Sequence, residues 1–103
     1  MKTVRHPRFS DSVRKAEKIL KKLQKGSAPE GIFALCLPEG ENHLEILPSV
    51  LLRQKYYQEK EGWILGVTMT RSEAEAMAAG MLTEAYRKDL LQDLRASFSE
   101  EFR

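Results

Sequence analysis

The sequence predicts an α+β fold, in which three strands form one sheet and two long helices cover the same face of it. Three observations lead to this prediction. An amphipathic helical pattern begins soon after the N-terminus, a capping motif opens a second long helix near residue 70, and three short runs rich in apolar residues lie between them. The chain has 103 residues, which is enough for one domain.

The first predicted element is a helix that starts near Val13, after a flexible basic arm formed by residues 1–10. Ser10 or Asp11 is placed to cap this helix, and Gly26 is placed to end it. At helical spacing its apolar residues fall in one stripe about 120° wide, formed by Val13, Ala16, Ile19, Leu20 and Leu23. Its basic residues fall on the opposite arc: Arg14, Lys15, Lys18, Lys21, Lys22 and Lys25.

The middle of the chain predicts three strands, with the first two paired antiparallel. Residues 32–37 are apolar throughout, which is typical of a central strand covered on both faces. A turn of hairpin length, residues 38–42, leads to residues 43–47, where apolar and polar side chains alternate as in a half-exposed strand. Residues 63–68 form the third strand, and Gly66 inside it indicates a bulge or a close approach of backbone.

Two helical elements flank the third predicted strand. Ser49 is placed to cap a short helical turn over residues 50–57. Later, Thr70-Arg-Ser-Glu73 matches the capping box, in which the threonine oxygen accepts a bond from the amide three residues on and the glutamate returns one. The residues that follow are rich in alanine and methionine, which have high helix propensity, so the motif predicts the start of a long helix.

Beyond Arg87 the apolar phase of this last helix moves to nearly the opposite side. Either the chain breaks near Lys88 and Asp89 and folds back, or one helix face packs on the sheet and the other on a partner. We expect residues 11–98 to form a single domain and residues 99–103 a short tail. The second apolar face predicts a homodimer through the C-terminal helix, because small residues would admit a second helix and larger ones would anchor it: Ala76, Gly80, Thr83, Leu90, Leu91, Leu94 and Phe98.

The residue patterns favour a non-enzymatic protein-interaction or regulatory module over an enzyme. Cys36 lies in an apolar strand, where a cysteine is expected to be buried and inert. His43 and Glu45 share one strand face, but two ligands are too few for a metal site. Glu39 and Glu41 lie in a hydrated turn, and none of the six glycines builds a phosphate-binding loop. We therefore expect no catalytic residue, no cofactor and no bound metal.

The charge of the chain is unevenly distributed. Residues 1–25 carry nine basic and two acidic side chains, which gives +7, whereas residues 26–103 carry eight basic and thirteen acidic ones, which gives −5. We expect most of the basic charge to be solvated or paired with the acidic remainder. The alternative is a nucleic-acid-associated regulator that contacts phosphates through the first helix, with Arg14, Lys18, Lys21, Lys22 and Lys25.

The expected compartment is the cytoplasm. The chain has one cysteine, its N-terminal residues are charged rather than apolar, and no apolar run approaches the roughly 20 residues of a membrane-spanning helix. The expected partners are therefore a second copy of the chain, another protein or a nucleic acid, and not a membrane.

The predicted order of helix, three strands and helix resembles that of the double-stranded-RNA-binding domain. That family holds phosphates with a lysine-rich motif at the start of its last helix. The corresponding residues here are Thr70-Arg-Ser-Glu-Ala-Glu75, which contain one cation and two acids. The departure falls on the residues that would carry the function, so no residue role is transferred from that family.

A second resemblance covers residues 32–87. The segments that carry it are His43-Leu-Glu-Ile-Leu-Pro-Ser49, Tyr56-Tyr57 and Gly62-Trp-Ile-Leu-Gly-Val-Thr68, followed by Glu73-Ala-Glu-Ala. Together they look like a family of short uncharacterised bacterial proteins. This resemblance implies a bacterial cytoplasmic origin and no known activity.

Overall fold

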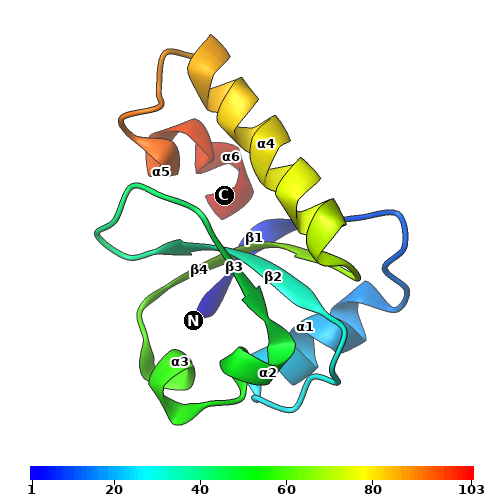
Figure 1. Ribbon diagram of the computed structural model, residues 1–103. Coiled ribbons are helices and arrows are strands. Elements are labelled where there is room, and N and C mark those ends of the chain that lie inside the picture. The colour runs from blue at the N-terminus through cyan, green and yellow to red at the C-terminus, as the bar shows by residue number, and fades with distance from the viewer.

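A mixed sheet of four strands forms the centre of the computed structural model, which describes residues 1–103 (Figure 1). The spatial order is β1-β4-β2-β3, with β1 parallel to β4 and the other neighbours antiparallel. The strands are β1 (Lys2–Phe9), β2 (Phe33–Pro38), β3 (Glu45–Pro48) and β4 (Gly62–Thr68). The α+β class and the antiparallel first hairpin are confirmed, but the prediction of three strands is wrong because it omits β1.

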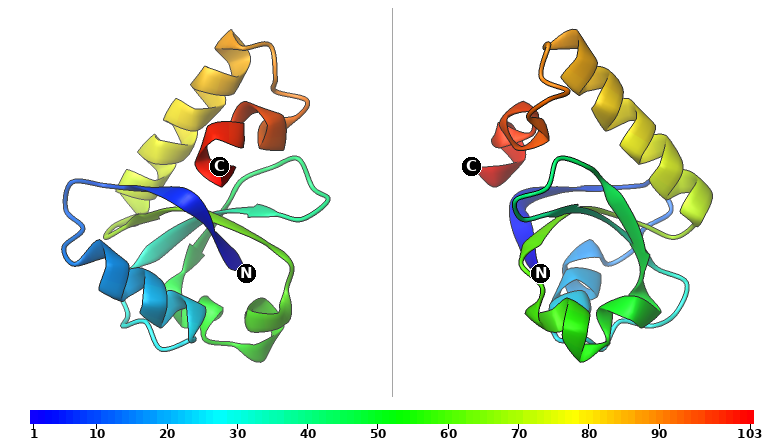
Figure 2. Two further views of the ribbon diagram at one scale, coloured as in Figure 1. Left: turned by 180° about the vertical axis from the view of Figure 1, so that it is seen from behind. Right: turned by 60° about the vertical axis from the view of Figure 1, so that its left-hand side comes forward.

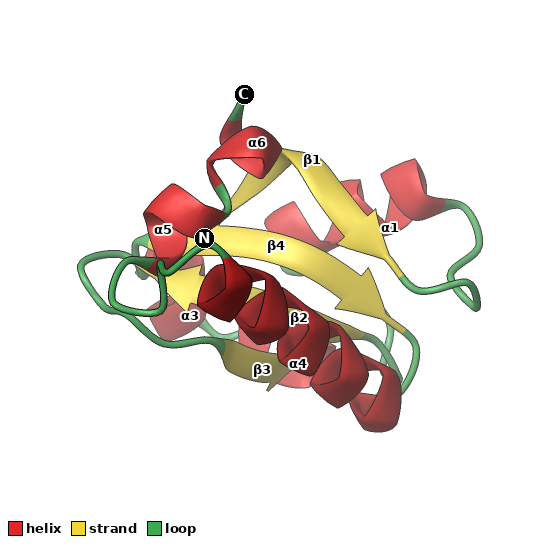
Figure 3. Cartoon of the chain, turned by 90° about the horizontal axis from the view of Figure 1, so that it is seen from above, coloured by secondary structure: helices red, strands yellow, loops and turns green.

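Six helices complete the fold, and only two of them are longer than five residues (Figure 3). They are α1 (Ala16–Gln24), α2 (Ser49–Leu52), α3 (Lys55–Glu59), α4 (Arg71–Arg87), α5 (Leu94–Ser97) and α6 (Ser99–Phe102). The predicted helical turn over residues 50–57 is thus two short helices, α2 and α3. The added N-terminal strand also removes the likeness in element order to the double-stranded-RNA-binding domain.

The N-terminal segment that the sequence predicts as a flexible arm is the edge strand β1. Its sequence hides this role because only Val4 is buried and Pro7 removes one backbone donor. An edge strand tolerates both features, and its register on β4 shifts between Thr3 and Arg8, on either side of Pro7. Its partner β4 lies far along the chain and runs parallel to it. Parallel strands are not joined by a hairpin turn, so the sequence contains no turn motif that would predict this pairing.

The strand β4 contains the bulge that Gly66 predicts. The register between β2 and β4 shifts at this point and leaves Leu65 without a partner in the pairing. A Cβ atom at Gly66 would overlap the Sδ atom of Met77 in α4 and would lie 3.1 Å from the backbone oxygen of Arg8. The close approach of Met77 and of the Arg8 backbone therefore favours glycine at this position.

The sheet separates two hydrophobic clusters, and the two long helices lie on its opposite faces (Figures 1 and 2). Leu23 of α1 packs in the first cluster, whereas Met81 and Ala85 of α4 pack in the second. The central strand β2 supplies alternate residues to both clusters, which confirms that it is covered on both faces: Ala34 and Cys36 to the first, Leu35 and Leu37 to the second. The expectation that both long helices cover one face is wrong, because a strand with two apolar faces needs cover on each side.

The start of α1 differs from the prediction. The helix begins at Ala16, after Lys15 in the left-handed region at φ 53°. The amide of Ser10 donates to the oxygen of Val67, so Ser10 continues the pairing of β1 instead of capping a helix. Asp11 does not cap it either, because the capping position is Lys15, which makes no side-chain capping bond.

The start of α4 follows its motif closely. Thr70 Oγ1 accepts a hydrogen bond of 3.1 Å from the amide of Glu73, as the capping box predicts. The returning bond is displaced by one residue, because Glu73 Oε1 accepts from the amide of Met69. Both carboxylate oxygens of Glu73 lie 2.8 Å from Ser12 Oγ and share its one hydroxyl hydrogen, and this hydroxyl is the main reason why the pKa of Glu73 is lowered.

The chain breaks after α4 and folds back, which is the first of the two alternatives for the C-terminal segment. Lys88 caps α4 and Asp89 adopts a left-handed φ of 57°, which reverses the chain direction. Leu94 and Phe98 then enter the second cluster, where they are 2% and 0% exposed. Residues 99–103 are not a tail, because they contain α6, which packs beside β1.

The whole chain forms one domain. Its radius of gyration is 12.8 Å, close to the value of about 13 Å for a globular domain of roughly this length. None of the helices has both the length and the apolar character needed to cross a membrane.

Candidate functional site

A strongly basic surface is formed by α1, its preceding loop and β1, which lie side by side (Figure 2). We call this surface the basic face. All of its cationic residues are exposed except Lys22, which is half-buried. They are Arg5, Arg14, Lys15, Lys18, Lys21, Lys22 and Lys25, whereas Lys2 lies in a hollow beside Glu39, Glu59 and Glu61. The fold therefore brings the five predicted phosphate-contacting residues to one region and adds Lys15 and, from the neighbouring strand β1, Arg5.

The cations of the basic face make no ion pair with the acidic part of the chain. Six ion pairs exist in the molecule, and they involve Arg8, His43, Lys55 and Arg103. Of the nine basic residues in the first 25, only Arg8 is among them. The cations of the basic face are thus solvated and not paired, which is one of the two outcomes expected for them, and Asp11 and Glu17 are exposed in the same segment.

The position of α1 is fixed by its apolar side and by its two ends. Leu23 is buried in the first cluster, and Ile19 and Leu20 pack against the same cluster. At its C-terminal end, Gln24 Nε2 donates a bond of 2.9 Å to Thr3 Oγ1 in β1. These contacts hold the helix with its lysine-rich side toward solvent, as its amphipathic pattern predicts.

The short helix α3, which carries two tyrosines, approaches the C-terminal end of α1 through Gln58. The two elements are close at Gly26, because a Cβ atom at this residue would lie 3.2 Å from the side chain of Gln58 in α3. In α3, Tyr56 is 64% exposed and contacts Tyr57 edge-to-face at a ring separation of 4.9 Å. Lys60 Nζ lies 5.7 Å from the Tyr56 ring, so this corner combines an exposed aromatic ring with a cation.

A second charged cluster joins β1 to the C-terminal segment. Arg8 donates two hydrogen bonds to Glu84 of α4, and its Nε donates to Glu101 of α6 at 2.8 Å. Hydrogen bonding to Arg8 lowers the pKa of Glu84. Burial opposes the charge on Arg8, but the bonds to the two glutamates outweigh it and raise its pKa. The hollow beside this cluster, about 650 Å³, has no hydrophobic lining, unlike an ordinary small-molecule pocket.

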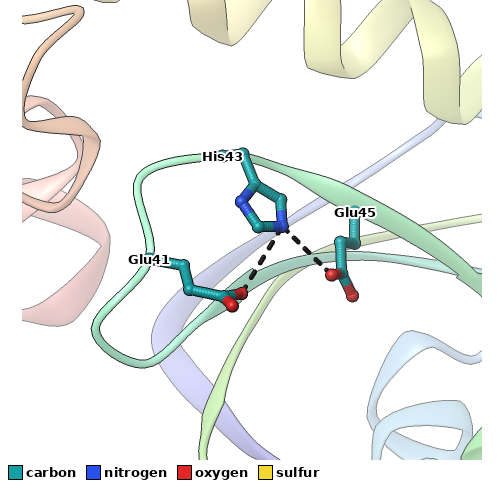
Figure 4. Close-up of side chains that lie close together, drawn as sticks. All are labelled: Glu41, His43 and Glu45. Atoms are coloured by element: carbon teal, nitrogen blue, oxygen red, sulfur yellow. Dashed lines mark hydrogen bonds and ion pairs between the residues drawn. The ribbon is translucent and has the colours of Figure 1, made fainter.

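A third cluster lies at the end of the β2–β3 hairpin (Figure 4). The ring of His43 points its Nε2 atom between two carboxylates, at 3.1 Å from Glu45 Oε1 and 3.5 Å from Glu41 Oε2. The exposed fractions of the side chains are 52% for His43, 49% for Glu41 and 28% for Glu45. Sequence reasoning paired His43 with Glu45 but missed Glu41, although the spacing of two residues on each side was the available signal.

Cys36 is buried, as its apolar strand predicts. It is 0% exposed, and burial raises the pKa of its thiol to about 12, with a further contribution from Glu45. A thiolate is the reactive form of cysteine, so this residue is not poised as a nucleophile.

The predicted dimer interface is divided by the fold. Of the large residues predicted to anchor a second copy, Leu94 and Phe98 are buried in the core and Leu90 is half-buried. Leu91 is 44% exposed, and the small residues of α4 remain on its solvent side: Ala76, Gly80 and Thr83. The structure therefore covers the second apolar face with the chain's own C-terminal segment, and the best anchors are unavailable to a partner.

The comparisons with known proteins identify no relative of this chain. No family model, no curated protein and no solved structure matches it.

Proposed function

We propose that this protein binds nucleic acid through the basic face. The observation that carries the proposal is the gathering of seven cationic residues on neighbouring elements, with none of them in an ion pair. Uncompensated lysine and arginine gain free energy when phosphates replace their counterions, because the condensed ions on the nucleic acid are released. The contacts expected here hold the backbone and do not read base edges.

The spacing along α1 fits a row of phosphates. Lys18, Lys21 and Lys25 follow one side of the helix at intervals of three and four residues. They span about 10 Å of helix axis. One strand of duplex DNA presents about three phosphates over that axial distance. This match supports contacts between the three lysines and successive phosphates along one nucleic-acid strand.

The exposed ring of Tyr56 favours a single-stranded partner. Single-strand-binding proteins combine a basic surface with aromatic rings on which bases stack. Tyr56 belongs to α3, whose Gln58 lies next to Gly26 just after the lysine row, so a strand that follows the lysines would reach this helix. The acidic residues Glu59 and Glu61 close to this ring limit the basic surface on that side.

The direct test is fluorescence anisotropy with labelled 20-nucleotide RNA, single-stranded DNA and duplex DNA. The double variant Lys18→Glu/Lys21→Glu should weaken binding of single strands by at least about tenfold, because two phosphate contacts are lost and replaced by repulsion. Circular dichroism of each variant checks that α1 remains folded.

The matched control is Arg87→Glu/Arg103→Glu. It changes the net charge by the same amount, at exposed residues outside the basic face. This control should bind nearly as tightly as the unmodified protein. If the two double variants lose affinity equally, overall charge and not the basic face is responsible, and the proposal fails. Undetectable binding by the unmodified protein at low salt also refutes it.

A further inference from the structure

We propose that the hairpin cluster of Glu41, His43 and Glu45 is a binding site for a first-row divalent metal ion, with Zn²⁺ as the simplest occupant. This site goes beyond the proposed binding of nucleic acid. It lies next to β3, and β1 forms the opposite edge of the sheet. The three side chains each offer one ligand atom, and all three atoms lie within 4.8 Å of one another.

The distances between the ligand atoms fit a tetrahedral ion. With metal–ligand bonds of about 2.0–2.1 Å, two ligands of tetrahedral zinc are about 3.3 Å apart. His43 Nε2 lies 3.1 Å from Glu45 Oε1 and 3.5 Å from Glu41 Oε2, on either side of that value. Only the two carboxylates must move closer to each other, and both side chains are long and partly exposed (Figure 4).

The backbone that carries these ligands is held from its other side. Asn42, between two of the ligands, donates to the oxygen of Leu91 at 2.8 Å and accepts from the amide of Leu94 at 2.7 Å. Leu44, between the other two, packs against the second hydrophobic cluster. Alternate residues are therefore tied to the C-terminal segment, while the residues between them present their side chains together. This arrangement reduces the ordering that a metal ion would otherwise impose.

The charge and chemistry of the cluster favour a transition metal. No lysine or arginine forms an ion pair with Glu41 or Glu45, so the imidazole is the only ionic partner of either carboxylate. One imidazole nitrogen with two carboxylate oxygens suits Zn²⁺, whereas Ca²⁺ and Mg²⁺ prefer oxygen ligands alone. The metal ion would bind the lone pair of Nε2. In that complex the neutral ring carries its single N–H proton on Nδ1. Water completes the coordination, as at zinc sites with three protein ligands.

The test is isothermal titration calorimetry with ZnCl₂ on the full chain. One equivalent should bind, and a large excess of Mg²⁺ should not compete. Both His43→Gln and Glu41→Gln should weaken binding by at least about tenfold. Loss of a residue that only hydrogen-bonds to a metal ligand already costs about tenfold in affinity, and loss of a ligand itself should cost at least as much. Nitrogen-15 spectra of the histidine rings should show Nε2 of His43 shifting on titration.

The matched controls are His6→Gln and Glu39→Gln. His6 is the only other histidine and lies on β1, and Glu39 accepts a bond from Trp63 Nε1 instead of joining the cluster. These variants should bind Zn²⁺ like the unmodified protein. The proposal is overturned if the unmodified protein binds no Zn²⁺, if the His43 and Glu41 variants bind equally well, or if the controls lose binding to the same extent.

Discussion

At the scale of single residues, Arg8 makes the most consequential polar contacts in the molecule. It joins three elements that are far apart in the sequence, because its partners are Glu84 of α4 and Glu101 of α6. Glu101 is only 8% exposed, so removal of Arg8 would leave a nearly buried carboxylate without its cation. The sequence shows a basic residue near the N-terminus but gives no sign of these partners.

The substitution Arg8→Met should therefore destabilise the protein by about 2 kcal/mol, the usual scale for losing hydrogen bonds to a charged group. Urea unfolding measures this change. Arg5→Met is the matched control, because Arg5 is exposed and makes no ion pair, and it should change the stability little. If both variants have the same unfolding free energy, the cluster contributes nothing to stability.

The same cluster makes stability depend on pH. The pKa of Glu84 is lowered in the folded state by Arg8, so the unfolded chain binds more protons in the acidic range. This contribution is present above the ordinary pKa of a glutamate and is lost as the pH falls through the lowered value. The stability of Arg8→Met should consequently fall less steeply on acidification. A slope equal to that of the unmodified protein would contradict this assignment.

Cys36 provides a second residue-scale prediction. Its pKa of about 12 and its complete burial imply that the folded protein should not react with a thiol reagent such as DTNB at neutral pH. Reaction should appear together with the unfolding transition in urea, because only the unfolded chain exposes the thiol. Rapid reaction of the folded protein would show that the first cluster opens locally.

At the scale of elements, the segment α5–α6 acts as the cover of the second hydrophobic cluster. Phe98→Ala should cost about 4 kcal/mol, because it removes a fully buried aromatic side chain. Leu91→Ala, at a residue 44% exposed, should stay within about 0.5 kcal/mol of the unmodified protein. Thermal unfolding distinguishes this account from the dimer prediction. If Phe98→Ala remains as stable as the control but changes the oligomeric state, Phe98 belongs to an interface and not to the core.

The elements that the sequence predicts well are those with local signals. The capping box at Thr70 marks the start of α4 within one residue, and the apolar run around Cys36 marks β2. Gly66 correctly indicates both a bulge and a close approach. Each signal depends on residues within a few positions of one another, so no tertiary contact is needed to interpret it.

The elements that the sequence misses depend on distant contacts. β1 has one buried residue, Val4, and is a strand only because it pairs with β4. The start of α1 is delayed because the amide of Ser10 is used by Val67, far along the chain. The third ligand of the hairpin cluster, Glu41, is brought to His43 by the hairpin loop. Periodicity cannot supply such information, because it describes one element at a time.

At the scale of the whole molecule, exposed positive charge is concentrated on and around α1. Most of the basic residues of the first 25 remain on the basic face, and only Arg8 is paired with the acidic C-terminal part. The near-neutral net charge of +2 therefore conceals a molecule with a distinctly positive side. Such a side attracts polyanions at low salt and loses them as salt is added.

The measurement that tests this account most directly is the salt dependence of the dissociation constant for a single-stranded oligonucleotide. Contact with at least four phosphates predicts that the logarithm of the association constant, the reciprocal of this dissociation constant, falls with log salt at a slope of about −2.8 or steeper, at about −0.7 per phosphate. The double variant Lys18→Glu/Lys21→Glu should flatten this slope by more than about 1. A slope near zero, or one that this variant leaves unchanged, would contradict the assignment of nucleic-acid binding to the basic face.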